Sequence, residues 1–339
     1  MKRGIFKQAK KFLPLVGILV LIIIIISLDV EEIKNAFLSI NPIFIVLALS
    51  LTIPRVLIRN FGWRLIQKEQ KIKISYFQSL KCFLIGYFYA CWTPGFVGQL
   101  MRVPYMKEKT GEPYGKLFVN TFIEVTIRQV AIYVMIVTGL LVILNQFSEL
   151  EISKIIPIII AVLIVFQAII IFYFIKKERG EKFFHLFIRY VIPKKLKDPS
   201  SRFVNTFYKD FPKINRLIIP LFLSFITWVI IFSQQYIIVY ALGANIPYLS
   251  FLLLYPIANI AGYIPVTFAG LGFRELTSII IFSTLFGVGE EVVLVFTLVG
   301  FIITDVMTGL VGFIVSLTEA RKTNITDFKK MLTKNNNNY

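Results

Sequence analysis

The feature that most constrains this chain is a series of long apolar runs with few charged residues. The first, FLPLVGILVLIIIIISL, occupies residues 12–28 and holds no charged side chain. A helix of about 20 apolar residues spans the hydrocarbon core of a bilayer. The sequence therefore predicts an all-α polytopic membrane protein with about six full spans. The predicted spans are 13–28, 43–60, 117–144, 155–175, 217–241 and 292–317.

Composition supports this class and excludes two others. The chain is 57% hydrophobic, more than a soluble domain of 339 residues can bury. The apolar runs are continuous rather than alternating, which argues against a β-barrel. The net charge of +18 does not indicate nucleic-acid binding, because Lys and Arg gather in the loops between apolar runs. Loop cations set topology and contact anionic headgroups, so membrane lipids are the expected partners.

Loop charge predicts the orientation of the chain. Basic and acidic loops alternate: the N-terminus is basic, DVEEIKN after residue 28 is acidic, and the loop 176–216 has twelve Lys/Arg against four Asp/Glu. By the positive-inside rule, both termini face the cytoplasm of a multi-pass cell-membrane protein. We expect residues 1–320 to form one transmembrane domain, with an uncleaved first helix. Loop 176–216 then forms amphipathic helices on the inner leaflet, and the tail 321–339 is disordered.

Two further apolar regions, 80–103 and 249–287, fit the charge alternation only if each enters and leaves the bilayer on the same side. Helix-breaking residues interrupt both: Pro94, Gly95 and Gly98 in the first, and Pro265, Gly270 and Gly272 in the second. Non-helical backbone at membrane depth is tolerated only where protein covers it or where it lines a water-filled cavity. We therefore predict two re-entrant helical hairpins, which enter from opposite sides.

The two breaks are similar in sequence. The first reads TPGFVGQLMR from Thr93 and the second reads IPVTFAGLGFRE from Ile264. Similar hairpins with opposite entry sides are typical of an inverted repeat, a common transporter plan. Chance similarity between two glycine-rich breaks explains the same ten residues, and the sequence leaves both interpretations open.

Ionisable residues inside apolar sequence are the candidate binding residues, because each is costly there and needs a partner or a function. Glu124 and Arg128 share a helix face at i, i+4, either as a self-contained ion pair or with Arg128 free to contact a headgroup. The basic stripe of Arg55, Arg59 and Arg64 can extend its charges toward the inner leaflet surface. The candidate substrate-binding set is Arg102, Glu124, Arg128, Arg274, Glu275 and Asp305.

The second break suggests an anion site. A helix that restarts near Gly272 offers free N–H groups that bind phosphate, and Arg274 adds a bidentate donor. Glu275 either caps this helix or pairs with a basic residue. Arg102 is the counterpart of Arg274 in the first hairpin, or it extends to the cytoplasmic surface. Asp305 either pairs with an arginine or carries a proton.

Residues that hold metals or perform covalent catalysis are sparse. The two cysteines, Cys82 and Cys91, and the single His185 form no metal-ligand or disulfide spacing. No paired-carboxylate or nucleophile–base arrangement stands out. We expect no metal, no cofactor and no enzymatic activity.

Four segments resemble a known family, the transmembrane region of lysylphosphatidylglycerol synthases, also described as flippase-like. They are TPGFVGQLMR (Thr93–Arg102), FIEVTIRQ (Phe122–Gln129), IPVTFAGLGFRE (Ile264–Glu275) and RNFGWRLI (Arg59–Ile66). The third looks like the family pattern Pro-x-x-x-Gly-Gly-x-Gly-x-x-Glu, with Ala269 in place of the first glycine. In the second, the family usually has adjacent Glu-Arg, whereas here Arg128 follows Glu124 by four residues.

The resemblance covers residues 10–320 and implies two re-entrant segments and movement of lipid between leaflets. The full synthases also carry a soluble aminoacyltransferase domain. The chain ends at Tyr339 without one, so transfer of lysine from tRNA is not expected.

The leading functional hypothesis is a flippase for an anionic, aminoacylated or polyprenyl-phosphate-linked lipid. Arg102, Arg128 and Arg274 would hold the headgroup while the lipid chains stay in the bilayer. An integral-membrane transferase that uses the intramembrane carboxylates is an alternative. A non-catalytic membrane partner of a separately encoded lipid-modifying enzyme is another, and homo-oligomerisation is left open.

Overall fold

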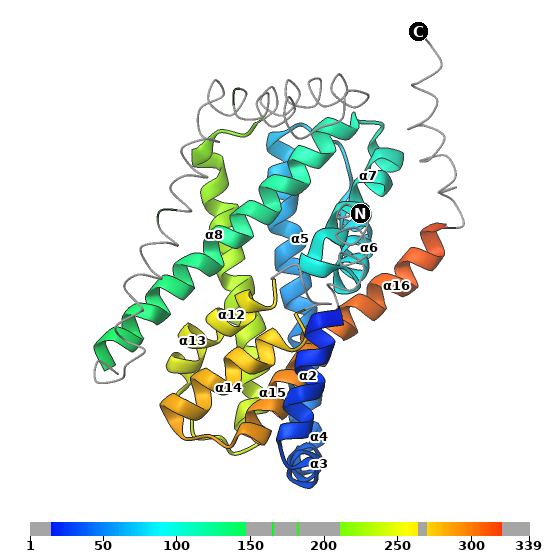
Figure 1. Ribbon diagram of the computed structural model, residues 1–339. Coiled ribbons are helices and arrows are strands. Elements are labelled where there is room, and N and C mark those ends of the chain that lie inside the picture. Colours follow the sequence, from blue (N-terminus) through cyan, green and yellow to red (C-terminus); the bar gives the residue numbers. More distant parts are fainter. Residues whose placement is uncertain (1–14, 147–164, 166–181, 183–210, 264–269, 321–339) are drawn as a thin grey trace, which may run out of the picture.

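The computed structural model describes residues 15–146, 165, 182, 211–263 and 270–320 (Figure 1). Every regular element in these ranges is a helix. The predicted span 155–175, most of the loop 176–216 and the tail 321–339 lie outside the described residues. An all-α fold is confirmed for the part of the chain that the structure describes.

Within the described ranges, four helical rods are long and apolar enough to cross a membrane, which confirms four of the predicted spans and lengthens them. Their bounds are Pro42–Glu69, Tyr114–Asn145, Ile214–Ala241 and Glu290–Glu319. The first joins α4 (Pro42–Ser50) to α5 (Thr52–Glu69), the second is α8 (Tyr114–Gln146), the third joins η4 (Ile214–Leu217) to α12 (Ile218–Ala241), and the fourth joins α15 (Glu290–Phe301), η5 (Ile302–Val306) and α16 (Met307–Ala320). The predicted span 13–28 contains the shorter apolar helix α2 (Leu15–Ser27).

One predicted loop is a helix. DVEEIKN was expected to be an outer loop, but it opens α3 (Val30–Ser39). The Asp29 carboxylate caps this helix by accepting hydrogen bonds from the backbone N–H groups of Glu31 and Glu32, at 2.8 and 3.2 Å. Such a cap satisfies donors that a helix start leaves free, and acidic residues in the first turn suit the helix dipole. None of the α3 residues is buried.

The first predicted hairpin is present. The helix α6 (Tyr76–Cys91) descends from the upper end of the bundle in Figure 1, and the 3₁₀ helix η1 (Pro94–Met101) and α7 (Arg102–Thr110) return to that end. The turn between them is tight, because the N–H of Gly98 donates to the Thr93 hydroxyl at 2.7 Å. A Cβ at Gly98 would lie 2.1 Å from the carbonyl oxygen of Tyr89, so only glycine fits there.

The second predicted hairpin enters from the other end. The helices α13 (Tyr248–Ala261) and α14 (Phe273–Phe286) both have their outer ends at the lower end of the bundle (Figure 1). At the break, Gly270 and Gly272 have φ of 84° and 90°, a region that glycine adopts without strain. A Cβ at Gly270 would lie 2.6 Å from the Cα of Gly262. Pro265 lies outside the described residues.

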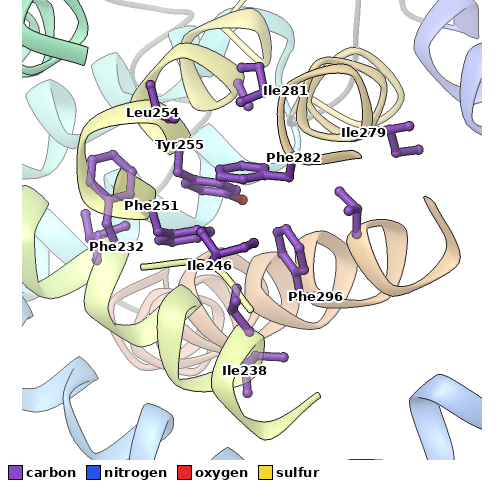
Figure 2. Close-up of a cluster of buried hydrophobic side chains, with 14 of the residues drawn as sticks. Phe232, Ile238, Ile246, Phe251, Leu254, Tyr255, Ile279, Ile281, Phe282 and Phe296 are labelled. Atoms are coloured by element: carbon purple, nitrogen blue, oxygen red, sulfur yellow. The ribbon is translucent and has the colours of Figure 1, made fainter. Parts of the chain in front are cut away.

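The second hairpin is held by aromatic packing. Phe251 on α13 stacks on Tyr255 and on Phe282 of α14, with ring centroids 4.8 and 5.3 Å apart (Figure 2). Phe232 of α12 and Phe296 of α15 meet the edges of these rings. All five side chains are fully buried. Contacts of this kind are favourable but weakly directional.

The first hairpin also packs rings, Phe83 against Trp63 and Phe88 against Phe313, and it adds buried hydrogen bonds. The Ser79 hydroxyl on α6 donates to Asn60 on α5 at 3.0 Å and accepts from Gln67 at 3.1 Å. The guanidinium of Arg102, the first residue of α7, donates to the carbonyl oxygen of Thr121 on α8 at 3.3 Å. Because hydrogen bonds depend on direction, these contacts fix the first hairpin against α5 and α8 more narrowly than ring packing does.

One glycine in each of two long helices allows a hairpin that is distant in sequence to approach closely. A Cβ at Gly139 of α8 would lie 2.0 Å from the carbonyl oxygen of Leu253 on α13. A Cβ at Gly312 of α16 would lie 2.1 Å from the carbonyl oxygen of Leu84 on α6. Small residues allow such close backbone approach in membrane helices.

We predict that Gly312→Ala destabilises the protein although alanine favours helix. Gly62→Ala on α5 is the matched control, because a Cβ at Gly62 meets only Leu223, at 3.6 Å. Replacing glycine by alanine in a helix interior raises the stability of the helix by about 1 kcal/mol. Gly62→Ala should show this gain, whereas Gly312→Ala should lose it to the clash. Thermal unfolding in detergent measures both. Equal melting temperatures for the two variants would contradict the close backbone contact.

Candidate functional site

A small cavity lies where the tips of the two hairpins meet. The first hairpin contributes Tyr87, Ala90 and Gln99 to its wall, and the second contributes Asn259, Gly262, Tyr263 and Arg274. Long helices complete the wall with Arg55, Arg59, Arg128, Trp228, Ile231 and Asp305. The space open to the centre of a water molecule is about 20 Å³, room for one or two waters and too small for a lipid headgroup.

Arg55 is buried beside a π-helical turn. Its guanidinium donates to the carbonyl oxygen of Thr304 at 2.7 Å and to the Thr308 hydroxyl at 2.6 Å. Thr304 belongs to η5, the π-helical segment Ile302–Val306 inside the last rod. Turns of this kind leave the regular helix ladder irregular and often occur at functional sites. The stripe on α5 was expected to extend toward the leaflet surface, but Arg55 points into the bundle instead.

Arg59, Glu124 and Arg102 form a buried ion-pair chain behind the cavity. The Arg59 Nε donates to Glu124 Oε1 at 3.3 Å, and Arg102 donates to Glu124 Oε2 at 2.5 Å. The guanidinium of Arg102 also lies over the Trp63 ring, 4.3 Å from its centroid. Buried charges need such partners, because desolvation costs several kcal/mol per ion. Arg102 therefore does not extend to the surface, which corrects that alternative.

Arg128 does not pair with Glu124 on its own helix. The Glu124 carboxylate forms salt bridges with Arg59 and Arg102, so the alternative of a self-contained Glu124–Arg128 ion pair is wrong. Arg128 instead donates to Gln99 Oε1 at 3.3 Å and to the Tyr263 hydroxyl at 3.3 Å, and it thereby touches both hairpins.

Arg274 and Glu275 form a second buried pair at the break in the second hairpin. The guanidinium of Arg274 donates twice to Glu275 Oε1, at 3.0 and 2.5 Å. Glu275 Oε2 accepts the N–H of Gly272 at 2.6 Å, so Glu275 caps α14, which begins at Phe273. Capping and pairing, the two roles considered for Glu275, thus occur together.

Asp305 faces the cavity from η5 and makes no salt bridge within the described ranges. Its Oδ1 accepts the Tyr87 hydroxyl at 2.6 Å, and its Oδ2 accepts the Thr304 hydroxyl at 2.9 Å. Four arginines, Arg55, Arg59, Arg128 and Arg274, line the same cavity.

The structure brings the six candidate residues into one region. Arg128, Arg274 and Asp305 line the cavity, Glu124 and Glu275 bind the cavity arginines Arg59 and Arg274, and Arg102 binds Glu124. Sequence reasoning missed Gln99 as a contact of two arginines, and it did not assign Arg55 and Arg59 to a cavity. A usable signal was present, because the two stripe arginines lie at i, i+4 deep in an apolar helix.

What the cavity offers is a set of cationic donors without a matching set of acids. Among the residues that the structure describes, no group of three or more His, Cys, Asp or Glu side chains gathers to hold a metal ion. Guanidinium groups in a buried site bind anions, above all phosphate and carboxylate.

A family model described as the lysylphosphatidylglycerol synthase TM region matches residues 14–312. The chain belongs to the lysylphosphatidylglycerol synthase TM region family. The match spans both hairpins and every residue of the cavity wall. No curated protein matches the chain. Together with the apolar rods, the family makes this chain a multi-pass membrane protein.

We predict that Glu124→Gln lowers the free energy of unfolding by about 3–5 kcal/mol, because two buried guanidiniums lose their carboxylate. Glu31→Gln is the matched control: its pair with Lys34 is exposed, at 68% and 60%, and should be worth at most about 1 kcal/mol. Denaturant titration in detergent micelles measures both variants. A loss for Glu124→Gln no larger than for Glu31→Gln would show that the buried ion-pair chain adds no stability.

Proposed function

We propose that this protein moves a lipid with an anionic headgroup between the two leaflets of the cell membrane. The observation that carries the proposal is the cavity between the hairpin tips, lined by four arginines and one acid. A phosphoryl headgroup that enters it exchanges water for charge-assisted hydrogen bonds. The lipid chains remain in the bilayer beside the bundle.

Because the cavity is small, a headgroup can enter only after the helices around it move apart. A space of about 20 Å³ cannot hold a headgroup, so the hairpins or their neighbouring helices have to separate before one enters. The tips come from opposite ends of the bundle (Figure 1). Movement of one hairpin opens the cavity toward one leaflet, and movement of the other opens it toward the second.

We propose that the two halves of the chain form an inverted repeat, which would permit this alternation. The order long rod, hairpin, long rod occurs twice, first as α4–α5, α6–α7 and α8, then as α12, α13–α14 and α15–α16. The glycine contacts repeat the relationship across the two halves: α8 meets the second hairpin through Gly139, and α16 meets the first through Gly312. Rocking of one half against the other around a central site is the usual motion of such transporters.

Orientation follows from charge. The helices α5 and α7 end at the upper end of the bundle in Figure 1 and have Lys68, Lys107 and Lys109 in their last turns, whereas α15 begins at the lower end with Glu290 and Glu291 in its first turn. By the positive-inside rule the upper end faces the cytoplasm, the side on which the sequence predicts both termini. The proposed activity is non-enzymatic, since moving a headgroup needs binding and release but no bond cleavage.

We predict that Arg128→Gln slows transport of fluorescent phosphatidylglycerol in reconstituted vesicles by about tenfold or more, the effect of losing one charge-assisted hydrogen bond. Arg64→Gln is the control, because Arg64 donates to the carbonyl of Ile74 and does not line the cavity. It should transport like the unmodified protein. If no anionic lipid crosses faster than in empty vesicles, the proposed function is wrong.

A further inference from the structure

We infer that the headgroup of the transported lipid carries two negative charges on its phosphoryl part, as a phosphate monoester or a diphosphate does. The inference rests on the proposed lipid transport and names its substrate class. The observation behind it is an imbalance of buried charge around the cavity.

The buried network has two more cations than anions. It contains the arginines Arg55, Arg59, Arg102, Arg128 and Arg274. Three carboxylates accompany these five guanidiniums, from Glu124, Glu275 and Asp305, so the difference is +2. The apolar stretches 155–175 and 264–269 cannot supply a missing carboxylate, because neither contains Asp or Glu.

The two positive charges in excess belong to two arginines that contact no carboxylate. Arg55 and Arg128 are only 3% and 5% exposed, and in the described part of the chain both donate only to neutral oxygens. The other three arginines each contact a carboxylate. A buried cation without an opposite charge is unfavourable by several kcal/mol, so a bound anion would stabilise both positions.

Gln99 marks where a phosphoryl oxygen fits. Its Oε1 accepts from Arg128 at 3.3 Å and from Arg59 at 3.4 Å. Charge-assisted hydrogen bonds are usually about 2.7–2.9 Å long, so this neutral oxygen holds two guanidiniums loosely. An anionic oxygen that displaces the Gln99 amide would bind both more strongly. Since Arg55 lines the same cavity, a second anionic oxygen on the same headgroup can reach it.

The net charge of the network with a headgroup bound differs between lipid classes. A zwitterionic headgroup leaves the network at +2 and a phosphodiester leaves it at +1, whereas a dianionic group neutralises it. A phosphate monoester loses its second proton near about pH 6, so it is mainly dianionic above neutral pH.

The test compares phosphatidic acid with phosphatidylglycerol, both fluorescent, in phosphatidylcholine vesicles that hold the full chain at about pH 8. We expect phosphatidic acid to cross about tenfold faster, the ratio typical of one added charge-assisted hydrogen bond. Gln99→Glu adds one negative charge at the bridging position. It should abolish the preference or turn it toward phosphatidylglycerol.

Gln99→Met is the matched control, because it removes the amide oxygen without adding charge, and the preference for phosphatidic acid should persist. Equal transport of the two lipids by the unmodified protein overturns the inference but leaves lipid transport standing, whereas transport of neither lipid overturns the proposed function itself. Binding of inorganic pyrophosphate without transport of phosphatidic acid would assign the charge pair to a soluble phosphate and overturn the lipid assignment.

Discussion

Buried guanidinium groups that must find acceptors inside apolar surroundings govern the arrangement of this protein. Arg59 of α5 and Arg102 of α7 meet at Glu124 of α8, so helices distant in sequence are drawn to one level of the bundle. Arg274 pairs with the adjacent Glu275 at the start of α14. Leaving any of these charges unpaired would cost several kcal/mol. The ion pairs at Glu124 thus hold the first hairpin against α5 and α8, and Arg128 links its tip to the second hairpin by donating to Gln99 and Tyr263. The cavity lies where the pairing of charges is incomplete.

The hairpins make this arrangement possible because they bring backbone breaks to membrane depth. Gly98 lets the first turn close against Tyr89, and positive φ at Gly270 and Gly272 turns the chain into α14. The two hairpins are anchored by different mixtures of contacts. Directional hydrogen bonds tie the first to α5 and α8 in addition to ring contacts, whereas stacked rings hold the second (Figure 2). Ring packing tolerates small sliding better than a hydrogen-bonded network, so we expect the second hairpin to move more readily.

Much of the architecture was predictable, because it follows from the cost of exposing apolar or charged groups to the wrong solvent. The length of the apolar runs predicted the long helices. The charges of the loops and the positions of Pro and Gly predicted two hairpins that enter from opposite ends. Local capping was harder: Asp29 turns an acidic stretch into α3 once its carboxylate accepts from the helix N–H groups. The predicted span 155–175 and most of the loop 176–216 lie outside the described residues and stay predictions.

The sequence predicted which charged residues gather at the site but not which of them contact one another. Spacing on one helix suggested that Glu124 binds Arg128, yet the carboxylate serves Arg59 and Arg102, which lie 65 and 22 residues away in sequence. Sequence spacing reports neighbours within one helix and says nothing about competition from other helices. The same limit hid Gln99, since its importance arises only where two guanidiniums from α5 and α8 converge on one amide oxygen.

The central claim is that the tips of two opposed hairpins enclose a cationic cavity that opens in turn to each side of the membrane. Thiol labelling at Ala90→Cys tests it most directly, in a background where Cys82 and Cys91 are replaced, because Ala90 lines the cavity and is 1% exposed. Impermeant reagents should label this position from either face of oriented vesicles, and Ala48→Cys, buried in the core, should stay unlabelled. Labelling of Ala90→Cys from neither face, or equal labelling at both positions, would contradict the account.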